Sequence, residues 1–145
     1  MKLLKVGLLL LVLLLGSFAL NIGIHEYGHY VVADHYGLNP EIHIDTVSSG
    51  DKFALFTPSI FTSYTSGSVE LTSQDAVIAF AGPFVNLAFA LVICAAYLVI
   101  PKRKRTFLVQ TCFAMLAVPA FLSFVVNLLP VGFSDGAIIL SALLG

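Results

Sequence analysis

Two histidines and a glutamate lie within five residues, His25-Glu26-Tyr27-Gly28-His29, at the end of a long apolar run. On a helix, His25 and His29 share one face, so their imidazoles can bind one cation. Glu26 lies about 100° further round the helix, within reach of a water on that cation. Zn²⁺ on two neutral histidines needs another ligand and lowers the pKa of its water to about 7. A neighbouring carboxylate can take that proton, which is the chemistry of amide hydrolysis.

The alternative for this stretch is structural, with two helix histidines making ordinary hydrogen bonds beside a satisfied glutamate. The strongly hydrophobic surroundings favour the metal site, because ionisable residues are costly there and are usually functional. The site also needs a third ligand from elsewhere in the chain.

Asp135 is the best candidate for that third ligand. It is the only acidic residue after Asp75, and it lies between two apolar stretches. Metal coordination would neutralise a carboxylate that is costly to bury unpaired. The alternative is that Asp135 only caps the last helix, and the two roles can coexist. Other candidates lie in or beyond the end of the first helix: Asp34, His35, Glu41 and His43.

Composition indicates a membrane protein. Of the 145 residues 59% are hydrophobic and 10% charged, with a mean hydropathy of +0.99, whereas soluble domains carry about 25% charged residues. The net charge of −1 gives no case for nucleic acid. Cys94 and Cys112 both lie in apolar runs, so a disulfide framework is not expected.

Apolar runs predict an α-helical polytopic membrane protein whose residues 1–145 form one domain. Three spans are expected, at about 6–35, 76–100 and 106–129. Thr72-Ser73-Gln74-Asp75 supplies the start signal of the second helix. A short helix at 135–145 is too short to cross a bilayer alone.

The polar segment 37–74 is expected to be hairpin-like and to lie against the membrane or over the histidines. Glu41–Asp45 alternates as a half-buried strand does, Ser48–Asp51 indicates a turn, and Lys52–Phe56 is expected to be the returning strand. Gly37 and the nearby proline are expected to end the first helix.

The N-terminus has a second interpretation. Lys2 and Lys5 precede the apolar stretch Val6–Leu15 and the small residues around Gly16, which is the pattern of a signal peptide. A processed, secreted protein would lose the first span. Apolar character that continues directly into the histidines favours a span instead.

Three stretches together resemble the site-2 protease family of intramembrane zinc metalloproteases. His25-Glu26-Tyr27-Gly28-His29 is similar to its zinc-binding helix. Ala81-Gly82-Pro83-Phe84-Val85-Asn86 resembles the Gly-Pro-x-x-Asn of its middle span. Asn127-Leu128-Leu129-Pro130 with Asp135-Gly136 resembles its third-span segment. The three occur in the family's order and cover the three-span core from about residue 6 to the C-terminus.

The resemblance implies one zinc per chain, held by His25, His29 and Asp135, with Glu26 as general base and then acid. It implies that Asn86 and Asn127 help to place the substrate or polarise its carbonyl; the alternative for both is interhelical hydrogen bonding. The substrate would be a transmembrane segment of another protein, unwound and paired with a strand edge of the polar segment. A different class of function is a non-catalytic metal-binding relative that binds client helices, although such a site would not need Glu26. Neither the substrate's identity nor the oligomeric state follows from the sequence.

The chain departs from the family pattern beside the third motif. Ser134 stands where the family usually has leucine, and Val131-Gly132-Phe133 lacks a frequent second proline. Neither change removes a ligand. Two signals for the membrane orientation conflict. Lys2, Lys5 and the basic run Lys102–Arg105 favour the cytoplasm, which would place residues 37–74 outside. Members of the family hold zinc nearer the cytoplasmic face, which would require the opposite orientation.

Overall fold

The chain folds into three long apolar helices, one short helix and a small sheet. The computed structural model describes residues 2–45, 59–65, 72–132 and 134–144. Its elements are α1 (Lys2–His35), β1 (Glu41–Asp45), β2 (Ser59–Ser63), α2 (Ser73–Val99), the 3₁₀ turn η2 (Lys102–Lys104), α3 (Phe107–Leu128) and α4 (Asp135–Leu144). In this described part, α1, α2 and α3 are each long and apolar enough to cross a membrane. The prediction of three long apolar helices is confirmed.

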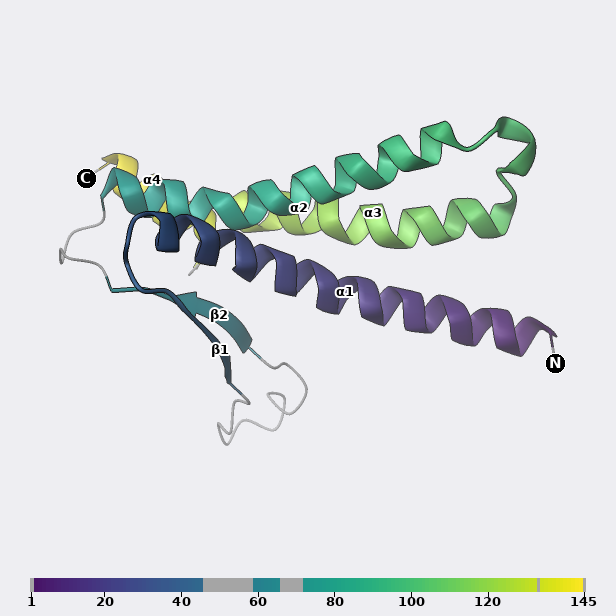
Figure 1. Cartoon of the computed structure of the whole chain (residues 1–145), viewed down its shortest axis with the longest axis horizontal. Coiled ribbons are helices and arrows are strands. Elements are labelled where there is room, and N and C mark those ends of the chain that lie inside the picture. The colour runs from purple at the N-terminus through teal and green to yellow at the C-terminus, as the bar shows by residue number, and fades with distance from the viewer. Residues whose placement is uncertain (1, 46–58, 66–71, 133, 145) are drawn as a thin grey trace.

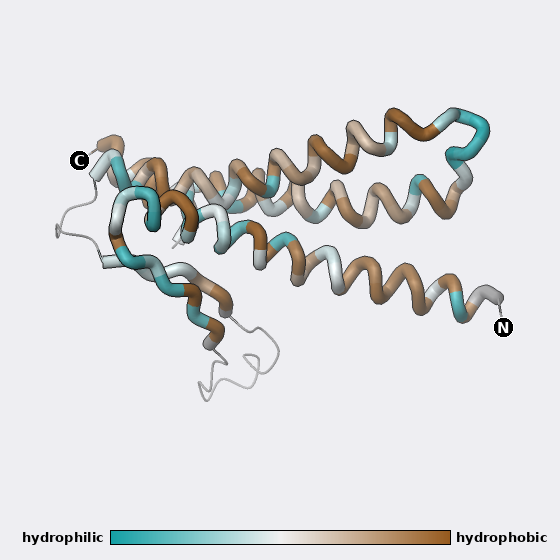
Figure 2. Tube along the Cα trace, in the orientation of Figure 1, coloured by the Kyte–Doolittle hydropathy of each residue, from teal (hydrophilic) through white to brown (hydrophobic). Residues whose placement is uncertain are grey.

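The three long helices run side by side and alternate in direction (Figure 1). The start of α1 and the turn between α2 and α3 lie at one end of the molecule. The sheet, α4 and the start of α2 lie at the other end. Lys2 and Lys5 belong to the start of α1, and Lys102–Arg105 form the turn between α2 and α3, which is coloured as hydrophilic in Figure 2. Both clusters of basic residues therefore lie at the same end of the molecule.

Local sequence signals end α1 and begin α2. Gly37 has φ of +71°, and the N–H groups of Gly37 and Leu38 donate to the carbonyls of Asp34 and Ala33, which is a Schellman cap. At α2, the Thr72 hydroxyl accepts from the N–H of Asp75, and the Asp75 carboxylate accepts from the N–H of Thr72. Both boundaries agree with those predicted from the sequence.

The sheet is two-stranded and antiparallel, with Glu41 opposite Ser63 and Asp45 opposite Ser59. β1 was predicted correctly, but its partner is Ser59–Ser63. The segments predicted as a turn (48–51) and a returning strand (52–56) lie outside the described residues. Several short apolar runs follow β1, and periodicity alone does not distinguish which of them pairs with it.

Two glycines allow α1 and α2 to approach closely. A Cβ on Gly28 of α1 would lie 2.8 Å from the carbonyl oxygen of Ala81 in α2. A Cβ on Gly82 of α2 would overlap the rings of His25 and His29. The helices therefore pack backbone against backbone at the histidine pair, and the Gly82-Pro83 step lies directly against both rings.

Candidate metal centre

His25, His29 and Asp135 converge on one point, although Asp135 is more than 100 residues away in sequence. His25 and His29 are neighbours on one face of α1, and Asp135 is the first residue of α4. Nε2 of His25 lies 3.2 Å from Nε2 of His29 and 3.1 Å from Oδ2 of Asp135. Nε2 of His29 lies 3.4 Å from Oδ1 of Asp135. A tetrahedral zinc with ligands at about 2.0–2.1 Å separates its ligand atoms by about 3.3 Å, so these spacings fit it.

The tautomer of His29 directs a lone pair into this cluster. Nδ1 of His29 lies 2.7 Å from the backbone oxygen of Ile78, and a carbonyl only accepts, so Nδ1 carries the proton. Nε2 of the neutral ring is then a bare acceptor, facing both Nε2 of His25 and the Asp135 carboxylate. Such acceptors repel one another unless a positive charge, a proton or a metal ion, lies between them. A backbone oxygen behind a ligating ring is also the usual support of a zinc histidine.

Asp135 is not needed as the cap of α4. The hydroxyl of Ser134 accepts a hydrogen bond from the N–H of Ala137 at 3.3 Å and so caps that helix. Oδ2 of Asp135 is buried and has no hydrogen-bond partner, despite its 3.1 Å separation from the ring of His25. Ser134, the departure from the family pattern, thus leaves Asp135 free to face the histidines.

Asn86 supports His25 from behind. Its Nδ2 lies 3.3 Å from Nδ1 of His25 and 2.7 Å from Oγ of Ser123, while Oδ1 is buried without a partner. If His25 binds a metal through Nε2, its proton is on Nδ1, and a half-turn of the carboxamide gives that proton an acceptor. Asn86 is 0% exposed, so its observed contacts are interhelical ones, joining α1, α2 and α3.

Asn127 differs from Asn86, because it lines the cavity in front of the histidines and Asp135. Its Nδ2 donates to the carbonyl and hydroxyl of Ser123. Of the two asparagines assigned to substrate placement, Asn127 is therefore the one whose position suits a substrate contact. That role stays a prediction for both.

Glu26 is held by the sheet. The hydroxyl of Thr62, on β2, lies 2.9 Å from Oε2 of Glu26 and 3.0 Å from its backbone oxygen. Glu26 is buried and lines the same cavity as the histidines. A hydrogen bond to a charged acceptor is stronger than one between neutral groups, so Thr62 fixes the direction of this carboxylate.

Tyr64 joins the segment after β2 to the start of α2. Its hydroxyl donates to Oδ1 of Asp75 at 3.0 Å. Burial, followed by the hydrogen bond to the Asp75 carboxylate, raises the pKa of Tyr64 well above its usual range. The phenol is therefore a neutral donor at physiological pH, and it lines the cavity opposite α1.

The cavity over this cluster has a volume of about 310 Å³. It is bounded by α1, β2, α2, the end of α3 and the start of α4. It is large enough for a short stretch of extended peptide, and it brings the carboxylate of Glu26 to the same space as the three candidate ligands.

The remaining candidate ligands lie elsewhere. Nε2 of His43 lies 2.7 Å from Oγ of Ser63 and 3.7 Å from Oε2 of Glu41, on the exposed sheet. Asp34 and His35 are exposed near the end of α1. Among the described residues, His25, His29 and Asp135 form the one group of three that could hold a metal ion.

Sequence reasoning missed three residues of this centre: Thr62, Tyr64 and Ser123. Ser123 had a usable signal, since it precedes Asn127 by four residues and shares its face of an apolar helix. Thr62 and Tyr64 had none, because their partners Glu26 and Asp75 lie on other elements.

Comparison with known proteins adds no family to this geometry. The chain matches no protein-family model, no curated protein and no solved structure.

Proposed function

We propose that the protein is a multi-pass membrane zinc endopeptidase similar to the site-2 protease family, cutting peptide bonds in or near transmembrane segments. The observation that carries the proposal is the convergence of His25, His29 and Asp135 at zinc-like spacings, with Glu26 facing the same cavity. A base beside three ligands suits hydrolysis, whereas a structural zinc site is closed by a fourth protein ligand.

A membrane location is supported by the three long apolar helices and their exposed apolar side chains. The sheet lies at one end of these helices (Figure 1), and its strand β2 lines the cavity. An unwound substrate segment could pair with a strand edge there, since extended chains bind sheets through their backbone groups.

Each residue has a defined part in the proposed reaction. Bound zinc would polarise the scissile carbonyl and acidify a water molecule. Glu26 accepts the proton of the attacking water at its free carboxylate oxygen and delivers it to the leaving nitrogen. Thr62 holds the other oxygen, Oε2, and so orients the carboxylate. Asn127 lines the same cavity, where its carboxamide would contact the substrate.

The alternative is a non-catalytic membrane protein of the same fold whose metal ties the helices together. In its favour, α1 and α4 both contribute ligands, so a metal would join them. Against it, a purely structural metal site does not need a base. Glu26 is nevertheless buried in the same cavity as the candidate ligands, where its carboxylate accepts from the neutral hydroxyl of Thr62.

The proposal is tested by metal analysis and peptide cleavage on the purified full chain. We expect one zinc per chain by mass spectrometry, and cleavage of a synthetic transmembrane peptide that stops when Glu26 is changed to glutamine. One zinc with no cleavage of any of a panel of transmembrane peptides would favour the non-catalytic alternative. Absence of zinc after purification without chelators would overturn both.

A further inference from the structure

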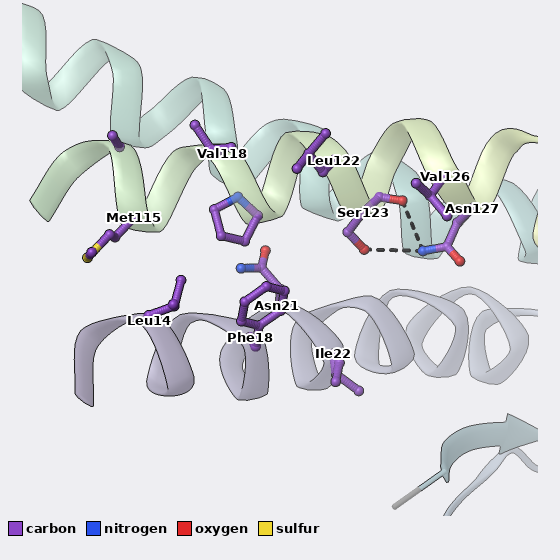
Figure 3. A pocket seen from close by; sticks show the side chains of 12 residues that line it. Leu14, Phe18, Asn21, Ile22, Met115, Val118, Leu122, Ser123, Val126 and Asn127 are labelled. Atoms are coloured by element: carbon purple, nitrogen blue, oxygen red, sulfur yellow. Dashed lines mark hydrogen bonds between the residues drawn. The ribbon is translucent and has the colours of Figure 1, made fainter. Parts of the chain in front are cut away.

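A groove between α1 and α3 lies next to the metal centre. Its volume is about 610 Å³. Apolar side chains from both helices form most of its lining, as Figure 3 shows: Leu14, Phe18, Ile22, Met115, Val118 and Leu122. Asn127 lines both this groove and the cavity at the metal centre. The two spaces therefore adjoin at Asn127.

One polar group in the groove has an unmet hydrogen bond. Asn21 is 3% exposed, and its Nδ2 donates to the backbone oxygen of Ser17 at 2.7 Å. Since that carbonyl can only accept, the amide nitrogen must face it, and Oδ1 is fixed as an acceptor directed away. Oδ1 is buried with no partner. In Figure 3 the amide of Asn21 points from α1 toward α3.

The facing helix does not satisfy this acceptor. Pro119, which also lines the groove, has no N–H to donate. The hydroxyl oxygen of Ser123 accepts from Asn86 and Asn127, and its O–H makes no hydrogen bond to Oδ1 of Asn21. A buried acceptor in apolar surroundings is costly to leave unpaired, so an occupant of the groove that brings a donor is bound more tightly than one that does not.

The position of Asn21 relates this acceptor to the reaction. Asn21 lies four residues before His25, hence one helical turn, about 6 Å, from the first candidate ligand on the same face. A chain that entered the groove and reached the metal centre would pass Asn21 within a few residues of its scissile bond.

We propose that this groove admits the substrate's transmembrane segment and that Asn21 selects segments with a side-chain donor, Asn, Gln, Ser or Thr, near the scissile bond. The proposal rests on the proposed function, which it sharpens into a substrate preference. A polypeptide is the occupant because the groove is apolar, shares Asn127 with the cavity at the candidate active site and contains the unpartnered acceptor Oδ1 of Asn21. Apolar side chains fill the lining, and one amide or hydroxyl meets Oδ1.

The test is a double-mutant cycle between enzyme and substrate in phosphatidylcholine vesicles, whose lipids carry no hydroxyl donor. Transmembrane peptides that differ at one position, asparagine or leucine, are scanned across the residues flanking the cut. We expect asparagine at one position to raise kcat/KM by about 5–10-fold for the wild type, and Asn21→Leu to abolish that preference, as expected for one buried hydrogen bond. Leu20→Ala, an exposed neighbour outside the groove, should keep it.

The zinc content of each variant is measured as the control for correct folding. Asn21→Ser serves as a second variant, because its hydroxyl retains an acceptor. Partial retention of the preference in Asn21→Ser is expected. An equal fall in kcat/KM for every peptide in Asn21→Leu would overturn the selection of a side-chain donor and indicate a backbone contact or a packing role. No positional preference in the wild type would overturn it too.

A binding arm separates this proposal from the proposed function. Affinity for the same peptides is measured with Glu26→Gln, with and without Asn21→Leu. A donor preference in binding without any cleavage by the wild type would uphold the groove and refute the protease. If peptide binding were lost only when hydroxylated lipids such as sphingolipids were added, the partner of Oδ1 of Asn21 would be a lipid. If crosslinked dimers of the chain formed in place of peptide binding, the partner would be a second copy of the chain.

Discussion

The two ends of the helix bundle are built from equally apolar sequence but pack differently. Among the described residues, the buried polar ones lie between the middle of α1 and the metal end: Ser17, Asn21, His25, Glu26, His29, Asp75 and Asn86. Large apolar side chains are exposed at both ends, for example Phe80 and Leu144 at the metal end and Leu98 and Val99 at the basic end. The metal end therefore differs by the polar groups that it buries, whereas both ends present apolar surface of the kind that a bilayer covers.

The difference follows from side-chain size along α2. Its buried residues end at Ala90, and most are small: Ala79, Ala81, Gly82, Pro83, Asn86 and Ala90. Small residues let helix backbones approach and bring polar groups into contact. Beyond Ala90 no residue of α2 is buried. Close packing is thus concentrated where three side chains must be held within 4.8 Å of one another. Five experiments test this contrast between the two ends.

Removal of a candidate ligand should have the largest effect. Asp135→Ala, His25→Ala and His29→Ala should each strip zinc from the detergent-purified chain and abolish cleavage, because two remaining ligands hold zinc poorly. Zinc is measured by mass spectrometry. Asp34→Ala and His35→Ala, exposed on the same helix, are the matched controls and should retain zinc. Full occupancy in Asp135→Ala would mean a different third ligand, with His43 next to be tested.

Glu26→Gln should separate binding from chemistry. The amide keeps the size of the side chain and can still accept from Thr62, but it cannot take a proton. We expect full zinc content and a fall in kcat of at least ~10²-fold. Glu41→Gln, on the exposed strand β1, is the control. Unchanged turnover in Glu26→Gln would show that another group is the base.

Gly28→Ala should damage the close packing at the metal end. The added methyl group would lie 2.8 Å from a backbone oxygen of α2, which cannot move aside as a side chain can, so a loss of about 1–3 kcal/mol in the free energy of unfolding is expected. Gly23→Ala, on the same helix with open space around it, should be neutral or slightly stabilising. Thermal unfolding of both variants in one detergent makes the comparison; equal midpoints would contradict the close approach.

Thr62→Val should weaken the reaction without removing the metal. Loss of one hydrogen bond to a carboxylate corresponds to about 1.5–3 kcal/mol, or roughly 10–100-fold in kcat if the base is misdirected. Zinc content and KM should change little, and Thr62→Ser should recover most of the activity. If serine were as poor as valine, the methyl group rather than the hydroxyl would be what matters.

Leu98→Ala and Val99→Ala should have the smallest effects. Both side chains are exposed at the basic end, so truncation creates no cavity. We expect unchanged zinc content and activity within about 2-fold of the wild type. Loss of zinc in either variant would show that the two ends are coupled and that the contrast between them is only apparent.

Much of the local structure was predictable, because it depends on neighbours in the chain. The spacing of His25 and His29 places them on one helical face in any helix. Gly37 and the Thr72–Asp75 pair set helix ends through hydrogen bonds between adjacent residues. The apolar length of α1, α2 and α3 needed no partner to be recognised, and Asp135 was singled out as an acidic residue isolated among apolar ones.

Tertiary structure decided what depends on distant pairs. The partner of β1 is Ser59–Ser63, a run that the sequence did not single out, since antiparallel pairing requires only a compatible pattern and several runs supplied one. The hydrogen bond from Thr62 to Glu26 and the support of His25 by Asn86 connect residues 36 and 61 positions apart, and no local rule selects such partners. The sequence by itself determined which side chains could do chemistry. The packing of α2 against α1 and of α4 against α2 decided which of them meet, because only contact between elements brings isolated polar groups within bonding distance.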